Sequence, residues 1–487
     1  MRARTVMMLA ATLTGAATAF SACSLGLDEA KINGTDGSAG DVITLPDIGP
    51  VPEGGNPVQC NVDNDCKPAN ACLTGKCDTT RRMCAYTICA TPMTCQASVC
   101  DNNTKTCSVP TKYTFHAGNF HIATGSIGCG GGGAGARKCF AAQYPFVFVG
   151  TTNGVVARSV ADPTDNGSDV VQVGGLPFFP AFVVSSGTRV YFVGSVGGSG
   201  PDYKVPMGWV DAPTDPTIKT ITAQAVFNTL QVPSIDAVYP DSKGGIYLVR
   251  ADSAKSFPVA HVAAPFKDLD AIQFFPLAGI PQNAAPVGGS GTRIVTFVNV
   301  GQYQNNFSIE NNAASGGAQN AGNQDITSTL GNVSGPFYVA HGSDGSLVWT
   351  GNGLVLNDAG GGNTAAVRVA WVLSDQMANT FDGTARVDVE AYGPQPGVGG
   401  DFPGPLAVID QKHVLVVSAP NSNLAQSSVQ IANREGASPA ITMNRKFVLP
   451  FHPSELGAAA SNGFGYVLTP DQVSGANVHV FASTCDN

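Results

Sequence analysis

The feature that most limits the fold of this chain is an array of cysteines between Cys60 and Cys107. The array holds nine of the thirteen cysteines in the sequence. So short a segment, with few large hydrophobic residues, cannot bury enough apolar surface to offset the entropy lost on ordering. Disulfides that close loops of this length contribute about 3 kcal/mol each. The array therefore predicts a disulfide-rich module over residues 60–108 and an oxidising compartment.

The array is an internal repeat that can be divided in two ways. The spacing C-x5-C-x4-C-x6-C runs from Cys66 to Cys84 and again from Cys89 to Cys107. Two copies of one small unit are the simplest interpretation, with at least two disulfides inside each copy. A second frame begins at Cys60 and leaves Cys107 over. The spacing fixes no pairing, because four cysteines allow three connectivities, and zinc is disfavoured because no histidine lies in the array.

In the second frame the first copy reads CNVDNDCKPANACLTGKC, with Asp63 and Asp65 before its second cysteine. This stretch resembles the small cysteine-rich repeats of Dickkopf-type and related extracellular modules. The resemblance covers under a tenth of the chain and depends mostly on spacing. It implies an extracellular interaction or stalk module and no activity.

The start of the chain has the pattern of a signal peptide over residues 1–22. Arginines precede an apolar run that ends at Phe20-Ser21-Ala22-Cys23. These four residues resemble a bacterial lipobox, whose cysteine is diacylated and becomes the mature N-terminus, although Phe20 stands where Leu is usual. Ser24 resembles the signal for outer-membrane sorting in Gram-negative bacteria. The competing interpretation is ordinary cleavage after an A-x-A site at residues 17–19.

Cysteine parity favours lipid attachment at Cys23 and so a membrane partner, because an even number of cysteines then remains to pair. The twelve cysteines predicted to form disulfides are Cys60, Cys66, Cys72, Cys77, Cys84, Cys89, Cys95, Cys100, Cys107, Cys129, Cys139 and Cys485. Residues 23–59 are rich in Gly, Pro, Asp and Ser without apolar periodicity, which predicts a flexible tether.

Residues 112–487 are predicted to form one mostly β domain. Short β-branched and aromatic runs end in Gly, Asn, Asp or Pro turns. The clearest runs begin at Tyr144, Thr188, Gly244, Thr292, Gly345, Lys412 and Gly463. Several follow a Pro, a short apolar strand and a polar turn, as in LPFFPAFVVSSGTRVYFV, and the unit recurs about every 53 residues.

Such a period predicts a β-propeller of six to eight blades, with seven favoured. The pattern resembles degenerate propellers of the Tyr-Trp-Thr-Asp type, with the LVWT sequence at 347–350 as the nearest match but without the final Asp. The alternative is a set of β-sandwich domains. A bond from Cys485 to Cys129 or Cys139 would join the last blade to the first, and a local Cys129–Cys139 bond is the other possibility.

No catalytic constellation, cofactor site or metal site is predicted. The sequence GCGGGGAGARKC at 128–139 lacks the Gly and Ser/Thr of a phosphate-binding loop, and no G-x-S-x-G elbow occurs. The histidines are scattered, and His116 and His121 should lie on opposite faces of an extended strand. Five aspartates could supply oxygen ligands for calcium, but turn chemistry explains them better: Asp162, Asp165, Asp169, Asp211 and Asp215.

A net charge of -9 disfavours nucleic acid as a partner. Two functions remain. One is a surface-anchored binding or adhesion module for a glycan or protein, in which the polar segment Gly301–Gly331 is a candidate recognition loop with Tyr303 and Phe307 as platforms. The other is an exported lyase or glycosidase whose carboxylates line a propeller channel. Clustered carboxylates in the channel would favour the enzyme.

Overall fold

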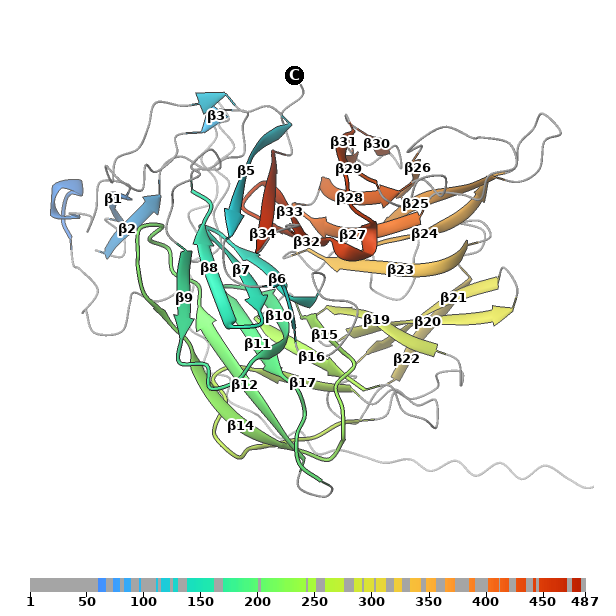
Figure 1. Ribbon diagram of the computed structural model, residues 1–487, viewed down its shortest axis with the longest axis horizontal. Coiled ribbons are helices and arrows are strands. Elements are labelled where there is room, and N and C mark those ends of the chain that lie inside the picture. Colours follow the sequence, from blue (N-terminus) through green and yellow to red (C-terminus); the bar gives the residue numbers. More distant parts are fainter. Residues whose placement is uncertain are drawn as a thin grey trace, which may run out of the picture. The chain divides into compact units, whose positions relative to one another are not determined.

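The structure is a computed structural model (Figure 1). The chain divides into two compact units, Met1–Pro50 and Val51–Asn487, and every described residue belongs to the second. The described residues are 60–66, 73–78, 83–88, 96–97, 111–112, 115–122, 126–129, 138–161, 170–199, 203–241, 244–250, 259–275, 284–290, 293–301, 304–311, 319–325, 333–342, 347–355, 364–372, 385–389, 402–410, 412–419, 426–434, 441–443, 446–470 and 475–482.

The described residues of the cysteine array and of the segment that follows it form two short antiparallel strand pairs. The elements are the 3-10 turn η2 (Asp63–Asp65) and the strand pairs β1 (Leu73–Asp78) with β2 (Met83–Ile88) and β3 (Gln96–Ala97) with β4 (Thr111–Lys112). Cys60 is bonded to Cys77, and the backbone N–H of Cys77 donates to the Asp63 carboxylate at 2.8 Å. The Cys60–Cys77 bond fits the frame that begins at Cys60. It contradicts the frame that begins at Cys66, because in that frame Cys77 would be bonded to another cysteine of the same unit.

The large domain is mostly β and contains seven mainly antiparallel sheets of three to five strands among its described residues, here numbered I to VII. Sheet I contains β6 (Phe140–Gln143), β7 (Phe146–Thr151), β8 (Gly154–Ser159), β9 (Val170–Gly174) and β13 (Ile221–Thr222). Sheet II contains β10 (Pro180–Ser186), β11 (Arg189–Gly194), β12 (Tyr203–Asp211), β14 (Gln224–Leu230) and β18 (Ala271–Ile272). Sheet III contains β15 (Ala237–Pro240), β16 (Gly245–Val249) and β17 (Val259–Ala263).

The remaining sheets follow in the same chain order. Sheet IV contains β19 (Ala284–Ser290), β20 (Arg293–Gly301), β21 (Gln304–Asn311) and β22 (Gln319–Asp325). Sheet V contains β23 (Val333–His341), β24 (Leu347–Val355), β25 (Thr364–Val372) and β26 (Ala385–Val389). Sheet VI contains β27 (Phe402–Val408), β28 (His413–Ala419), β29 (Ser427–Arg434), β30 (Ile441–Met443) and β31 (Phe447–Leu449). Sheet VII contains β32 (Gly457–Ser461), β33 (Phe464–Pro470), β34 (Ala476–Ala482) and β5 (His116–Ile122).

Each apolar run predicted from the sequence contains the second strand of one sheet: β7, β11, β16, β20, β24, β28 and β33. The short strand predicted before several of them is the first strand of the same sheet. The joining turns use the expected residues. Between β32 and β33, Asn462 and Gly463 have φ values of 54° and 82°, as a two-residue hairpin turn requires.

The first strands of successive sheets contact one another along the chain. Contacts join β6 to β10, β10 to β15, β15 to β19, β19 to β23, β23 to β27 and β27 to β32. Contacts also join β32 to β6, so the series returns to its beginning. The first three strands of sheet VII come from the end of the large domain, and its fourth strand, β5, comes from the start of that domain. Figure 1 shows blue-green β5 beside red β34.

Neighbouring sheets share hydrophobic cores where side chains are described. One core lies between sheets VII and I and includes Phe120, Val149 and Tyr466. Others lie between sheets I and II, between II and III, and between VI and VII. A strand with neighbours on both faces is buried along its length and mostly apolar, as in β7, whose six residues are all buried.

The prediction that Gly301–Gly331 is a loop between strands is wrong. About half of that segment forms β21 and β22, the third and fourth strands of sheet IV. Phe307 lies in β21 opposite Phe297 of β20, and Tyr303 lies outside the described residues. The alternation in NNFSIEN was a strand signal, while the polar sequence of β22 reflects its place at the edge of its sheet.

Candidate functional site

A buried aspartate joins sheets II and III. Asp241 follows β15, and its side chain is 4% exposed. Its Oδ2 lies 2.6 Å from Nε2 of His261 on β17. Its Oδ1 accepts hydrogen bonds from the backbone N–H of Gly245 at 2.7 Å and from the hydroxyl of Ser186 at 3.2 Å. These contacts satisfy the carboxylate without water, as a buried charge requires.

Tyr191 adds further hydrogen bonds to this contact between sheets II and III. Its hydroxyl donates to the Gly244 carbonyl and accepts from the N–H of Ala264 at 3.2 Å. The Arg189 guanidinium donates to the Ala264 carbonyl and pairs with Asp211 at 2.7 Å. Burial raises the pKa of Tyr191, so its hydroxyl keeps its proton at neutral pH and can donate.

A second aspartate has the same position in sheet VI. Asp410 follows β27, and its Oδ1 accepts from the N–H groups of Lys412 at 2.7 Å and His413 at 2.9 Å. Nδ1 of His413 lies 2.8 Å from both carboxylate oxygens. Burial alone would raise the pKa of Asp410, but the hydrogen bond and charge of His413 and the two backbone donors lower it.

These aspartate–histidine pairs stabilise turns. In both sheets the carboxylate binds the backbone N–H at the start of the second strand, which holds the preceding hairpin closed. Ser186 donates to Asp241 and not to His261, whereas a nucleophilic serine must face the histidine. A device that recurs in two sheets of one fold is better explained by folding than by catalysis.

The second cluster lies on one face of the β5–β34 pair. Asn477 is opposite His121 and His479 is opposite Asn119. A β-bulge then shifts the register, so that His116 is opposite Phe481 and lies on the same face as His121. The prediction that these two histidines lie on opposite faces is therefore wrong, because strict alternation holds only without a bulge.

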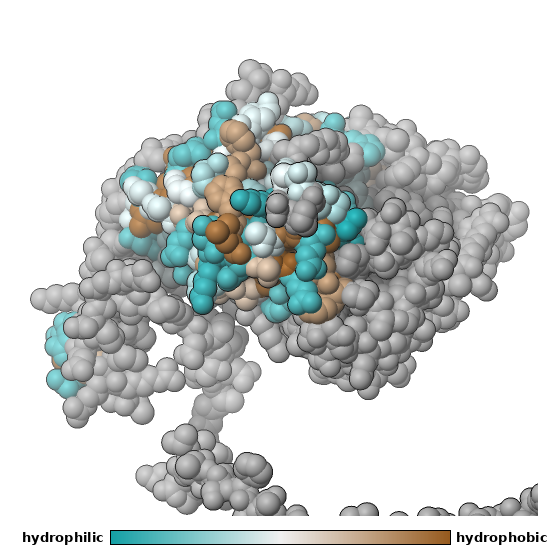
Figure 2. Space-filling model, turned by 90° about the horizontal axis from the view of Figure 1, so that it is seen from below, coloured by the Kyte–Doolittle hydropathy of each residue, from teal (hydrophilic) through white to brown (hydrophobic). Residues whose placement is uncertain are grey.

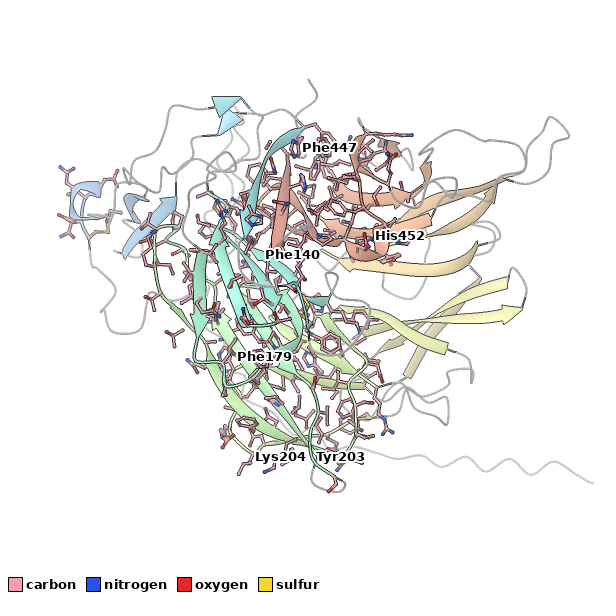
Figure 3. All side chains as sticks on the ribbon, in the orientation of Figure 1. Phe140, Phe179, Tyr203, Lys204, Phe447 and His452 are labelled. Atoms are coloured by element: carbon pink, nitrogen blue, oxygen red, sulfur yellow. A yellow bond between two sulfur atoms is a disulfide. The ribbon has the colours of Figure 1, made fainter. Side chains whose placement is uncertain are left out.

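Contacts on this face are close. Nε2 of His116 lies 3.3 Å from Nδ1 of His479, and Nδ1 of His121 lies 3.2 Å from Oδ1 of Asn477. Phe447 of β31, labelled in Figure 3, stacks on the His116 ring with centroids 4.1 Å apart and planes at 18°. Burial and the nearby His116 lower the pKa of His479 to about 4, and burial lowers the pKa of His116. Both rings are neutral at neutral pH.

The opposite face of β5 is a packed core. Phe120 and Ile122 are each 1% exposed. Arg158 of β8 is 2% exposed, donates to the His121 carbonyl, and lies 4.4 Å over the Phe120 ring. On the neighbouring turns, the hydroxyl of Ser461 accepts from the N–H of Tyr144 at 2.9 Å. The first and last sheets are thus joined by side chains from both.

Cys129 and Cys139 form a disulfide that closes the glycine-rich segment. This is the local alternative, and not a bond to Cys485, which lies outside the described residues together with Cys23. Cys66 is also disulfide-bonded. The sulfurs of Cys60, Cys66 and Cys77 lie within 4.8 Å of one another, but bonded sulfurs are not thiolate ligands for zinc. The other predicted cysteines without described side chains are Cys72, Cys84, Cys89, Cys95, Cys100 and Cys107.

The aspartates considered for calcium have ordinary partners where they are described. Asp211 pairs with Arg189, and the carboxylate of Asp215 accepts from the N–H and hydroxyl of Thr217 at 2.8 and 2.7 Å. Asp162, Asp165 and Asp169 lie outside the described residues.

The seven first strands contain no charged residue. Their sequences are FAAQ, PAFVVSS, AVYP, AAPVGGS, VSGPFYVAH, FPGPLAV and GAAAS. Small residues and Pro dominate, and the polar groups are hydroxyls, one amide and one imidazole. The described first strands therefore offer no carboxylate pair.

The described surface has no broad apolar area. Figure 2 shows hydrophilic and hydrophobic residues interspersed over the described part of the face it draws. The exposed large hydrophobic residues are Val62, Phe179, Phe227, Leu269 and Val448. None of the helices in the described ranges is long and apolar enough to cross a membrane.

Comparison with known proteins gives a limited result. No family model matches the chain, and no curated protein matches it. The structure of U3-55K matches with a TM-score of 0.40 and 12% identity over 72% of this chain and 96% of that chain. Sqt1 from Chaetomium thermophilum, bound to the N-terminus of ribosomal protein L10, matches with a TM-score of 0.38 and 12% identity over 76% and 100%. Scores this low support no conclusion about ligand or activity.

The sequence interpretation missed both aspartates and the cross-strand histidine pair. The sequence held a signal for the aspartates. Each lies within two residues of the end of the first strand of its sheet, and a glycine or a histidine begins the second strand shortly after it. No local signal existed for His116 and His479, which are 363 residues apart.

Proposed function

We propose that residues 116–482 form a seven-bladed β-propeller that acts as a non-catalytic binding module for a glycan or a protein. The proposal includes export and attachment to the outer membrane or cell surface through a lipid on Cys23. The cysteine-rich module would then act as a spacer between the lipid anchor and the propeller.

The order of the sheets supports the propeller. Seven sheets follow one another in the chain, each first strand contacts the next, and β5 completes the last sheet. Propellers are built by such radial repetition. In a two-layer sandwich two sheets face each other, which does not require first strands in a series of seven.

The composition of the first strands is the observation that carries the binding role. First strands surround the channel of a propeller, and a glycosidase places two carboxylates about 5–9.5 Å apart across its substrate. The first strands of this chain have no carboxylate. Asp241 and Asp410 are bound to turn donors and histidines.

The lipid anchor is supported by the sequence at Phe20-Ser21-Ala22-Cys23 and by the even number of cysteines that remains. Two acyl chains hold a protein on a membrane where a single chain does not. Substitution Cys23→Ser should move the protein from the detergent phase to the soluble fraction. A wild-type protein that is soluble and begins at Phe20 would show that the anchor is absent.

The binding role is tested with the mature chain made soluble by Cys23→Ser. The protein is applied to a glycan array and, in parallel, incubated with the same polysaccharides while reducing ends and unsaturated products are measured. We expect saturable binding without product, and no binding by the heat-unfolded protein. Product formation in proportion to protein concentration would contradict a non-catalytic role.

A further inference from the structure

The geometry points to a two-imidazole site for a divalent late transition metal ion, with Zn²⁺ as the probe, formed by His116 of β5 and His479 of β34. A metal bound there would clamp the first strand of the large domain to its last. This inference concerns the closure of sheet VII and does not depend on the ligand of the binding module.

The distance between the two ring nitrogens fits chelation. Nε2 of His116 and Nδ1 of His479 are 3.3 Å apart. This is long for an N–H···N hydrogen bond, since bonds donated by N–H usually measure about 2.9–3.0 Å. Two nitrogens bound to one tetrahedral zinc at about 2.0–2.1 Å are about 3.3–3.4 Å apart. The pair therefore already has the spacing of two ligands of one ion.

The rings are also held in place. Phe447 stacks on His116 at 4.1 Å, and the Phe481 ring lies 5.4 Å from the same imidazole. The backbone pairing of β5 with β34 fixes both Cα positions. A site with ligands held by packing loses less entropy when the ion binds.

The chemistry of the pair suits zinc, copper or nickel. A metal binds the neutral imidazole, and imidazole is a preferred ligand of these ions. When the ion binds, each ring keeps its proton on its other nitrogen, so no net proton is released. Both residues are partly exposed, and water would supply the remaining ligands.

A bound ion would stabilise the closing pair. The two ligands are 363 residues apart, so the unfolded chain seldom brings them together to bind one ion. A ligand that binds only the folded state raises the apparent stability by mass action. Zinc should therefore raise the melting temperature and slow hydrogen exchange of the amides in β5.

The test uses the mature Cys23→Ser chain, with its disulfides intact, without a histidine tag and stripped of metal by a chelator. Calorimetric titration with zinc at pH 7.5 compares this protein with His479→Gln, His116→Gln and the control His452→Gln. We expect one saturable site in the parent and in the control. Each variant of the pair should bind at least about tenfold more weakly, since even a lost second-shell partner costs about 10–100-fold.

Hydrogen exchange of residues 116–122 gives a second measurement. Zinc should slow it in the parent and in His452→Gln, and should not change it in either variant of the pair. Two variants are used so that a folding defect in one leaves the other informative. Equal zinc affinity in the parent and both pair variants, or no zinc binding by the folded parent, would overturn the site.

Discussion

Sheets II and VII both contain four antiparallel strands side by side. In sheet II these strands are close together in the chain, whereas sheet VII takes its fourth strand from a distant part of the chain. The four main strands of sheet II lie between Pro180 and Leu230, so hairpins and short connections join them. In sheet VII, β5 pairs with a strand more than 350 residues away. Closing so long a loop in an unfolded chain costs about 2–3 kcal/mol more than closing one of about 20 residues.

The two sheets are also stabilised differently. Sheet II is packed between apolar cores on both sides, and a buried aspartate network fixes its contact with sheet III. Sheet VII also lies between two apolar cores, but the face of β5 and β34 that is turned toward sheet VI carries a half-buried cluster of histidines and an asparagine. The comparison predicts that closure depends most on the apolar face of β5, and that its polar face responds to acid and to the proposed zinc ion.

The largest expected effect comes from the apolar face of β5. Phe120→Ala removes a side chain that is 1% exposed and carries the Arg158 contact, so we expect a loss of about 3–5 kcal/mol in the free energy of unfolding. The control Phe179→Ala changes a ring that is 59% exposed and should alter it by less than about 0.5 kcal/mol. Urea unfolding measures both. Similar effects of the two substitutions would show that β5 is not part of the core.

Acid should weaken the polar face of the same strand. The pKa of His479 falls from 6.5 to about 4 on folding, so the unfolded chain binds the proton more readily. Stability is therefore complete above about pH 6.5 and decreases toward pH 4, by about 3 kcal/mol for this group. The other titratable groups that the described contacts place on this face are His116 and His121.

The variant His479→Gln isolates this group. It should remove the part of the decrease between pH 6.5 and pH 4 that is due to His479, because the glutamine does not titrate, and leave the part due to His116. Chemical unfolding at several pH values makes the measurement. An unchanged pH dependence in the variant would assign the acid sensitivity to other groups.

The aspartate network tests the contact between sheets II and III. Asp241→Ala leaves the Gly245 N–H, the Ser186 hydroxyl and His261 without their shared acceptor, which should cost about 1–3 kcal/mol. Asp410→Ala should cost less, because the Asp410 side chain is 28% exposed and water can replace it. A larger loss for Asp410 in thermal unfolding would reverse our ranking of the two turns.

The smallest expected effect is at the surface of sheet II. Asp211 is 65% exposed and pairs with Arg189, so Asp211→Ala should cost less than about 1 kcal/mol. Calcium should not change the melting temperature of either protein, because Asp211 and Asp215 already have partners within the chain. A calcium-dependent shift that is lost in the variant would restore the calcium interpretation.

The repeated strands could be predicted because their signal is local. Runs such as TRVYFVG and KHVLVVSA combine β-branched residues with turn residues at each end, and they became β11 and β28. The polar segment after Gly301 was misassigned for the same reason. Strand β22 has the composition of a loop, and only its pairing with β21 reveals it, whereas β21 carried an alternation signal that the polar composition of the segment outweighed.

The closing face could not be predicted because it depends on register. His116 and His479 meet only because β5 pairs with β34 and because a bulge at this point turns His116 toward the partner. Neither the distant partner strand nor the bulge leaves a mark in the sequence around FHAGNFH. The two aspartates are an intermediate case. Their position after the first strand can be predicted from the sequence, whereas the histidine partner of Asp241, which lies in β17, cannot.

The pairing of β5 with β34 is tested most directly by a register-specific cross-link. His121 and Asn477 are directly opposite, and cysteines at opposed positions of neighbouring strands can form a disulfide. In His121→Cys/Asn477→Cys, peptide mapping without reduction should find a bond within one chain between the two strands. The control Asn119→Cys/Asn477→Cys is displaced by two residues and should form little of it. Equal yields from both pairs, or bonds only between chains, would contradict closure of the large domain by its first strand.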